Sequence, residues 1–207
     1  NIKPLLGKPL IAYTIEAAKA SGAFDRLIIS TDDPKIAEVC RAYGCEVPFM
    51  RPKELAEDKT PHLPVMQHAL KWLQDNHDYR PDYVMILQPT SPLRQHFHIK
   101  EATDLILKSG ADSVLSVAKI PENYSPHKAM VMDERGGLVL LSGKAVKERV
   151  ARRQDLKQAY WSVGAIYLFK TELLFADSPN FYGDFVAPYA MDEKYLIDIN
   201  ELSDWEK

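Results

Sequence analysis

The segment that decides the fold is Tyr83–Arg94, whose sequence is YVMILQPTSPLR. Its first five residues, Tyr83–Leu87, form a short apolar run, which is typical of a strand buried on both faces of a parallel sheet. Polar Gln88, Thr90 and Ser91 follow, and two interspersed prolines restrict the backbone. Because ligands of open α/β sheets bind beyond the carboxyl ends of the strands, this pattern favours a rigid strand end at a ligand site. A structural turn that leads into the next helix is the alternative.

Short apolar runs and helical periodicities alternate before and after this segment. The runs 27–29, 45–50, 83–87 and 113–117 predict strands. Apolar residues at helical spacing predict a helix from Pro9 to Gly22, one capped by Asp33, one that opens at Pro64 and one that ends at Gly110. Strands that alternate with helices predict an α/β protein, a three-layer α/β/α sandwich around a doubly wound parallel sheet.

The alternation stops after Val117. Two prolines and the turn 133–137 predict extended segments and a hairpin, and the charged stretch 144–158 predicts an exposed arm or helix. The apolar pattern resumes at 164–169. We interpret 1–207 as a single domain and 118–160 as an insertion in it, either a dimer contact or a solvated loop.

Composition excludes several classes of protein. The formal net charge is −3 and no stripe is dense in lysine and arginine, which argues against nucleic acid as a partner. No apolar run reaches the length of a membrane span and no signal peptide is visible, so we expect no membrane partner and a cytoplasmic location. Cys40 and Cys45 lack metal-ligand spacing and are expected to be buried, reduced thiols.

Residue types alone indicate where nucleotide chemistry could take place. Arg51 follows a predicted strand and suits a bidentate contact to a base or phosphate, although an arginine on the surface is the more frequent case. Asp198 lies in the apolar run Leu196–Asn200, interpreted as a strand, and a buried carboxylate needs donors or a cation such as Mg²⁺. The dinucleotide motif GxGxxG and the phosphate loop GxxxxGK[ST] are both absent from the sequence. These observations predict an α/β domain that binds phosphates or nucleotides, and they do not define its activity.

A family resemblance extends this interpretation. The heptapeptide QPTSPLR at 88–94 resembles the signature of the acylneuraminate cytidylyltransferases. Further segments resemble that family in the same order and at similar spacing, namely FDRLIISTD at 24–32, RPKELAED at 51–58, RQ at 153–154, GAIY at 164–167 and IDIN at 197–200. The resemblance therefore runs from end to end of the chain.

The resemblance implies an activity and a fold. Enzymes of this family join CTP to a nonulosonic acid, with Mg²⁺ or Mn²⁺, and release the CMP-sugar and pyrophosphate. The implied fold is a Rossmann-like nucleotidyltransferase domain with a dimerisation insertion, so a homodimer whose active site is completed across the interface is expected. A first strand and a phosphate-binding loop would precede Asn1, which would itself be the last loop residue and contact the nucleotide ribose.

The resemblance also implies roles for individual residues. On the nucleotide side, Arg51 would recognise cytosine, helped by the backbone near Thr60. The residues that would bind the sugar are Gln88, Thr90, Ser91, Tyr167, Phe181 and Tyr182. The partner subunit would supply a basic pair, Lys128 and Arg153. Asp198 and Asn200 would bind the metal. Asp198, Arg153 and Lys128 would be the catalytic residues.

Three departures from the family pattern bear on the substrate. Asn200 stands where the family has a second aspartate, and Val163 stands where it has the asparagine before GAIY. Trp161 with Ser162 replaces the polar residues that usually precede that asparagine. The sugar would then be N-acetylneuraminic acid or a relative such as legionaminic acid or the deaminated sugar. Alternatives are a non-catalytic nucleotide- or sugar-binding relative, a nucleotidyltransferase for another sugar acid, and a dinucleotide-dependent oxidoreductase.

Overall fold

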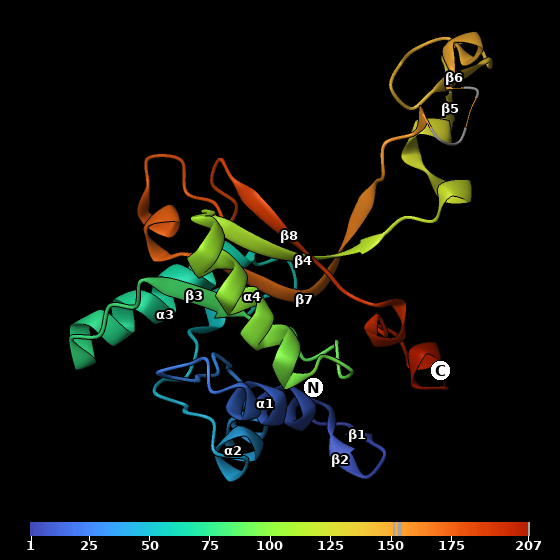
Figure 1. Ribbon diagram of the computed structural model, residues 1–207. Coiled ribbons are helices and arrows are strands. Elements are labelled where there is room, and N and C mark those ends of the chain that lie inside the picture. The colour runs from blue at the N-terminus through green and yellow to red at the C-terminus, as the bar shows by residue number, and fades with distance from the viewer. Residues whose placement is uncertain (151, 153–154, 207) are drawn as a thin grey trace. The chain divides into compact units, whose positions relative to one another are not determined.

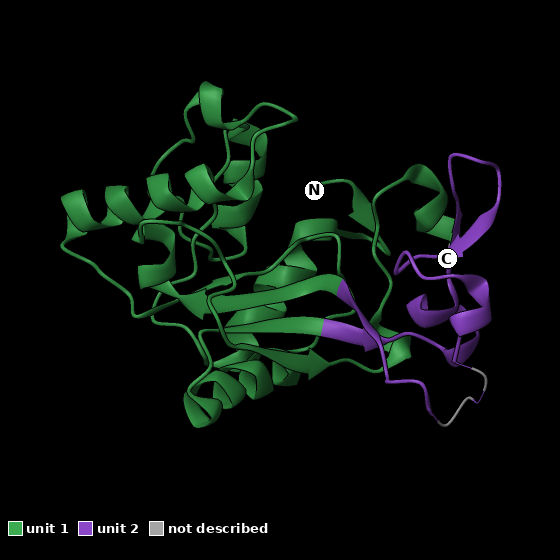
Figure 2. Ribbon diagram, turned by 90° about the horizontal axis from the view of Figure 1, so that it is seen from above, with its two compact units in different colours: residues 1–116, 163–207 green, residues 117–162 purple. Residues whose placement is uncertain are grey.

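The computed structural model describes all residues except 151, 153–154 and 207. The chain forms two compact units, one of residues 1–116 and 163–207 and the other of residues 117–162 (Figure 2). The second unit covers almost the same residues as the predicted insertion, and its part in dimerisation stays a prediction. In the described part of the chain, no helix combines the length and the apolar character that crossing a membrane requires.

A four-stranded sheet forms the centre of the first unit (Figure 1). Its strands lie in the order β3-β7-β4-β8, which are Tyr83–Ile86, Tyr160–Lys170, Ser113–Lys119 and Val186–Ala190. β3 pairs with β7 in antiparallel fashion, with Tyr83 opposite Lys170 and Ile86 opposite Tyr167. The sheet is therefore not the all-parallel sheet predicted. Periodicity indicates that a strand exists, but it does not give the direction in which that strand re-enters the sheet after a long excursion.

Three further predicted strands are shorter or missing. The runs 27–29 and 45–50 meet in a single parallel bridge between Ile28 and Glu46. The run Leu196–Asn200 is not a strand, which corrects the prediction. It lies beside the end of β3 instead, because the Ile199 amide donates to the Thr90 carbonyl at 2.8 Å.

The four α-helices follow the sequence closely, and their bounds are α1 Leu10–Ser21, α2 Pro34–Ala42, α3 His62–His77 and α4 His96–Ser109. Asp33 caps α2 as predicted, since its carboxylate accepts hydrogen bonds from the amides of Lys35 and Ile36. α3 begins two residues before Pro64. A small hairpin of β1 (Pro4–Leu5) and β2 (Lys8–Pro9) precedes α1. Short 3₁₀ turns complete the unit, at Lys53–Leu55, Thr171–Phe175, Glu193–Tyr195 and Leu202–Glu206.

The helices bury apolar faces against the sheet and against each other. Ile11 and Ile15 of α1 pack with the free, buried thiols of Cys40 and Cys45. Burial raises the pKa of the Cys45 thiol to about 12, so the neutral form predominates. Leu70 of α3 packs against Phe169 of β7, and α4 contacts α1 and β8.

The second unit is small and exposes apolar side chains. Its hairpin joins β5 (Met130–Met132) to β6 (Leu138–Leu140) around the predicted turn, where the Asp133 carboxylate accepts two backbone hydrogen bonds. Short 3₁₀ turns lie at Glu122–Tyr124, Pro126–Lys128 and Val146–Glu148. In the predicted arm 144–158, the described residues form only the last of these turns, a bridge at Ala145 and a short turn after residue 154. Met132 is 73% exposed and Leu138 is 60% exposed.

Candidate active site

The segment that follows β3 is a compact turn. The Ser91 amide donates to the Gln88 carbonyl at 3.4 Å, and the Arg94 amide donates to the Ser91 carbonyl at 3.2 Å. Ser91 and Arg94 are buried, whereas Gln88 and Thr90 are partly exposed. The turn therefore presents the Gln88 and Thr90 side chains at the carboxyl end of the strand, where an α/β sheet binds ligands.

Gln88 lies directly against the glycine of the GAIY segment. Gly164 has a φ of +69°, and a Cβ built on it would come within 2.6 Å of the Gln88 Oε1 atom. A side chain at 164 would occupy the space that the Gln88 amide takes. The structure thus brings together two segments that are 76 residues apart in the sequence, although each was assigned to the sugar side only by resemblance.

Two of the three predicted aromatic residues belong to one cluster near this strand end. Tyr167, which lies opposite Ile86 in the sheet, and Phe181 both pack on the buried cluster that contains Phe169. The Phe169 and Phe181 rings are 5.1 Å apart between centroids. Tyr182 is 47% exposed, and the structure does not place it in this cluster. An apolar wall of this kind suits the methyl group of an acylamino substituent.

Asp198 is the acidic residue beside this turn. Its Oδ2 atom accepts a hydrogen bond from Asn200 Nδ2 at 2.8 Å, whereas its Oδ1 atom is buried and has no hydrogen-bond partner among the described residues. A buried carboxylate oxygen without a donor is the kind of ligand that a cation satisfies. The described residues contain no cluster of three or more His, Cys, Asp or Glu side chains that could hold a metal. Asp198 therefore fits Mg²⁺ as part of a site that substrate phosphates and water complete, an arrangement common for this ion.

Arg51 is held against the segment that ends in Asp32. Its backbone amide donates to the Thr31 carbonyl at 2.8 Å, and its side chain donates to Ser30 through Nε and Nη2. Burial lowers the pKa of the Arg51 guanidinium, partly opposed by the charge of Asp32. The guanidinium is thus oriented before any ligand arrives. No pattern in the sequence indicated this role of Ser30.

In the described part of the chain, the hydrogen bonds of Thr60 and Asn1 do not connect them with this site, and the remaining two predicted residues lie in the second unit or outside the described residues. The Thr60 amide closes a turn with the Glu57 carbonyl at 2.9 Å, and the carbonyl of exposed Asn1 accepts from the Ile11 amide at 2.9 Å at the start of α1. Lys128 lies in the second unit, where its Nζ donates to the Glu122 carbonyl at 3.0 Å. Arg153 lies outside the described residues. The roles assigned to these four residues stay predictions.

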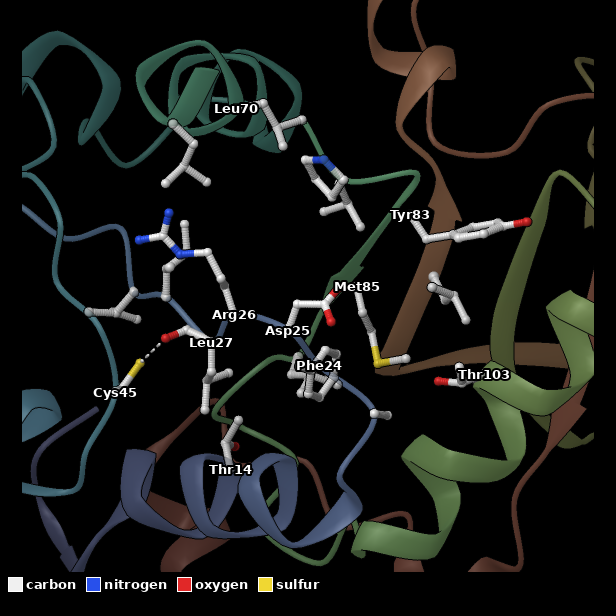
Figure 3. Close-up of a pocket in the computed structure, with 18 of the residues that line it drawn as sticks. Thr14, Phe24, Asp25, Arg26, Leu27, Cys45, Leu70, Tyr83, Met85 and Thr103 are labelled. Atoms are coloured by element: carbon white, nitrogen blue, oxygen red, sulfur yellow. Dashed lines mark hydrogen bonds between the residues drawn. The ribbon is translucent and has the colours of Figure 1, made fainter. Parts of the chain in front are cut away.

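The first unit also contains a cavity that is distinct from this site. It measures about 330 Å³ and lies between α1, residues 23–29, β3 and α4 (Figure 3). Its lining is mostly apolar, including Leu27, Leu70 and Met85, and Cys45 donates across it to the Leu27 carbonyl at 3.4 Å. Neither Gln88, Arg51 nor Asp198 lines it. Such a cavity suits an extended apolar chain segment better than a polyanion, and the expectation of a further strand stays a prediction.

The known proteins that this chain resembles include cytidylyltransferases. A family model described as cytidylyltransferase matches residues 1–204. The chain is 31% identical to a pseudaminic acid cytidylyltransferase of Campylobacter jejuni, over all of this chain and 86% of that protein. It is 32% identical to a CMP-N,N'-diacetyllegionaminic acid synthase of Legionella pneumophila, over 99% of this chain and 85% of that one. It is 30% identical to an N-acylneuraminate cytidylyltransferase of Streptococcus agalactiae, over 99% of this chain and 47% of that longer protein.

Solved structures confirm the predicted fold class. A 4-diphosphocytidyl-2C-methyl-D-erythritol synthase of Anaerococcus prevotii aligns with a TM-score of 0.65 at 12% identity, over 98% of this chain and 88% of that one. A CMP:2-keto-3-deoxy-manno-octonic acid synthetase complexed with CTP aligns with a TM-score of 0.60 at 15% identity, over 92% and 83%. With a matching family model and relatives at about 30% identity along nearly its whole length, the chain belongs to the cytidylyltransferase family of nucleotidyltransferases.

Proposed function

We propose that this protein uses CTP to activate a nonulosonic acid, giving the CMP-sugar and pyrophosphate. The observation that carries the proposal is the convergence of three segments at the end of β3. Gln88 lies against Gly164, and the Thr90 carbonyl binds the Ile199 amide next to Asp198. A residue suited to sugar hydroxyls and a carboxylate suited to a phosphate-bound cation thereby meet at one edge of the sheet.

The residues of this site divide the work of phosphoryl transfer. The Gln88 amide both donates and accepts, so it can orient a hydroxylated sugar tail, while Tyr167 and Phe181 offer apolar area to an acyl group. Arg51, whose guanidinium is held in place by Ser30, presents its remaining N–H donors to the base. Asp198, with the Asn200 amide oxygen, would hold Mg²⁺ or Mn²⁺, which when bound neutralises charge on the phosphates. The protein's part is chiefly to align the sugar hydroxyl with the α-phosphorus.

The proposed sugar is an acylated nonulosonic acid of the neuraminic, legionaminic or pseudaminic type. The three kinds of relative are equally similar to this chain, at 30 to 32% identity, so similarity alone does not select among them. Val163 and Asn200 are the departures nearest this site, and they give a reason to test sugars other than N-acetylneuraminic acid first.

We also propose a homodimer formed through the second unit. Its exposed apolar side chains on the β5–β6 hairpin, including Met132 and Leu138, are the surface that a symmetric partner would cover. Lys128 and Arg153 would then serve the partner's active site.

One assay tests the activity. The protein is incubated with Mg²⁺, each of the four nucleoside triphosphates and a panel of nonulosonic acids, and pyrophosphate release is measured. We expect release with CTP and at least one sugar of the panel. Binding of CTP without release for any sugar would instead indicate a nucleotide-binding relative without turnover, and release with another sugar acid alone would correct the substrate.

A further inference from the structure

Arg94 is a buried cation that the proposed chemistry does not use. Its side chain is only 2% exposed, and burial lowers its pKa to about 9. Its hydrogen-bond partners are neutral oxygens, and its Nε atom has no partner among the described residues. Keeping a guanidinium in such a place costs free energy, so the contacts it makes must be ones that a neutral side chain could not supply.

Those contacts join three elements at the proposed sugar side. Nη1 donates to the Gln88 carbonyl at 3.0 Å and to the Ala165 carbonyl at 2.8 Å, and Nη2 donates to the Thr14 hydroxyl of α1. A single nitrogen therefore links the backbone of Gln88 to the residue that follows Gly164. The Gln88 side chain contacts Gly164 across the same two segments.

We infer that Arg94 is the positioning residue for the sugar-side contact, and that it fixes the Gln88 amide against Gly164 by clamping the two backbones together. The inference rests on the proposed function of Gln88. Two carbonyl oxygens that face one another repel, and the forked guanidinium holds them at a set separation through donors whose directions are rigid. A lysine at 94 would keep the charge but lose the planar fork, so the two carbonyls would no longer be tied to one another and to Thr14.

The test compares Arg94→Lys with Arg26→Lys. Arg26 bonds to Glu46 and is not part of the proposed site, so it serves as a control for the same substitution. In Arg94→Lys we expect the KM for the sugar acid to rise about ten-fold while the KM for CTP changes by less than about two-fold, which corresponds to the loss of one or two well-aligned hydrogen bonds. Arg26→Lys should change neither KM.

A double-mutant cycle separates positioning from general damage. If Arg94 acts through Gln88, Arg94→Lys adds no further increase in the sugar KM once Gln88→Ala is present. An equal rise of both KM values, an unchanged sugar KM, or the same increase in the Gln88→Ala background would overturn the inference.

An NMR measurement that does not depend on catalysis tests the inference separately from the proposed function. The side-chain amide resonance of Gln88, assigned by its loss in Gln88→Ala, should shift in Arg94→Lys and stay in place in Arg26→Lys. An unshifted resonance overturns the inference even in an active enzyme, whereas a shifted one in a protein that releases no pyrophosphate overturns only the proposed function. If Arg94→Lys does not fold, Gly164→Ala tests the same contact, and an unchanged Gln88 resonance there would refute it.

Discussion

Replacing Gly164 by alanine is the most direct test of the candidate site. The new Cβ would lie 2.6 Å from Gln88 Oε1, a separation that real Cβ contacts do not show. The obstructing atom is the end of a flexible side chain, so we expect the Gln88 amide to rotate away while the backbone stays in place. Gly110 supplies a matched control, because it has the same φ of +69° and open space around its Cβ position.

The substitution should have two effects, a loss of folding stability and a rise of the KM for the sugar acid. Alanine in the left-handed region costs about 1 kcal/mol of folding stability, and this cost should be nearly the same in Gly164→Ala and Gly110→Ala. Only Gly164→Ala also displaces Gln88, which removes one or two hydrogen bonds to the sugar at about 1 kcal/mol each. We therefore expect the KM for the sugar acid to rise about five- to thirty-fold in Gly164→Ala alone.

The assay is steady-state pyrophosphate release with CTP saturating and the sugar acid varied, together with thermal unfolding of both variants. Similar losses of stability and a selective rise of the sugar KM in Gly164→Ala are the expected results. A sugar KM that is the same in Gly164→Ala, Gly110→Ala and the parent protein would refute the assignment of Gln88 to the sugar.

Three further predictions test the metal, the dimer and the buried thiol. Asp198→Ala should lower kcat at least about 100-fold, and excess Mg²⁺ should not restore it, since the carboxylate is the charged ligand of the site; near-normal turnover would remove Asp198 from the metal site. Met132→Glu should shift the sedimentation coefficient from dimer to monomer, whereas Leu202→Glu, at a side chain 74% exposed, should not, and an unchanged dimer would locate the interface elsewhere. Burial raises the folded-state pKa of Cys45 to about 12. Its contribution to the free energy of unfolding should therefore be fully present below the free thiol's pKa of 9.0 and should decline as pH rises toward 12. Chemical denaturation of Cys45→Ala should show a shallower decline between those values, and an identical pH profile would contradict the assignment.

The sequence predicted the helices well because their signals are local. Asp33 before Pro34 marks the start of α2, and Gly22 and Gly110 mark the ends of α1 and α4 in the left-handed conformation that glycine adopts without strain. The direction of β7 was not predictable in this way. It depends on how the chain returns from the second unit, and no residue within 164–169 carries that information.

The residues proposed for the site came from the resemblance, whereas the contacts that support them came from the structure. The roles of Gln88, Tyr167 and Asp198 stay predictions, and the structure brings their segments to one strand end. Arg94 ends the heptapeptide QPTSPLR, and nothing in the sequence indicates that it is buried and bonds to backbone carbonyls 6 and 71 residues away.

The burial of Arg94 follows from the position of its turn. The Gln88 carbonyl lies in the turn after β3 and the Ala165 carbonyl lies within β7, and both accept from Arg94 Nη1. A buried carbonyl needs a donor, and burial excludes water from supplying one. A neutral amide has two N–H donors on one nitrogen and cannot donate to both carbonyls and the Thr14 hydroxyl at once, whereas the guanidinium donates to all three with its two terminal nitrogens. The arginine that ends QPTSPLR is therefore explained by the backbone it satisfies, and the polar side chains in front of it depend on that support for their geometry.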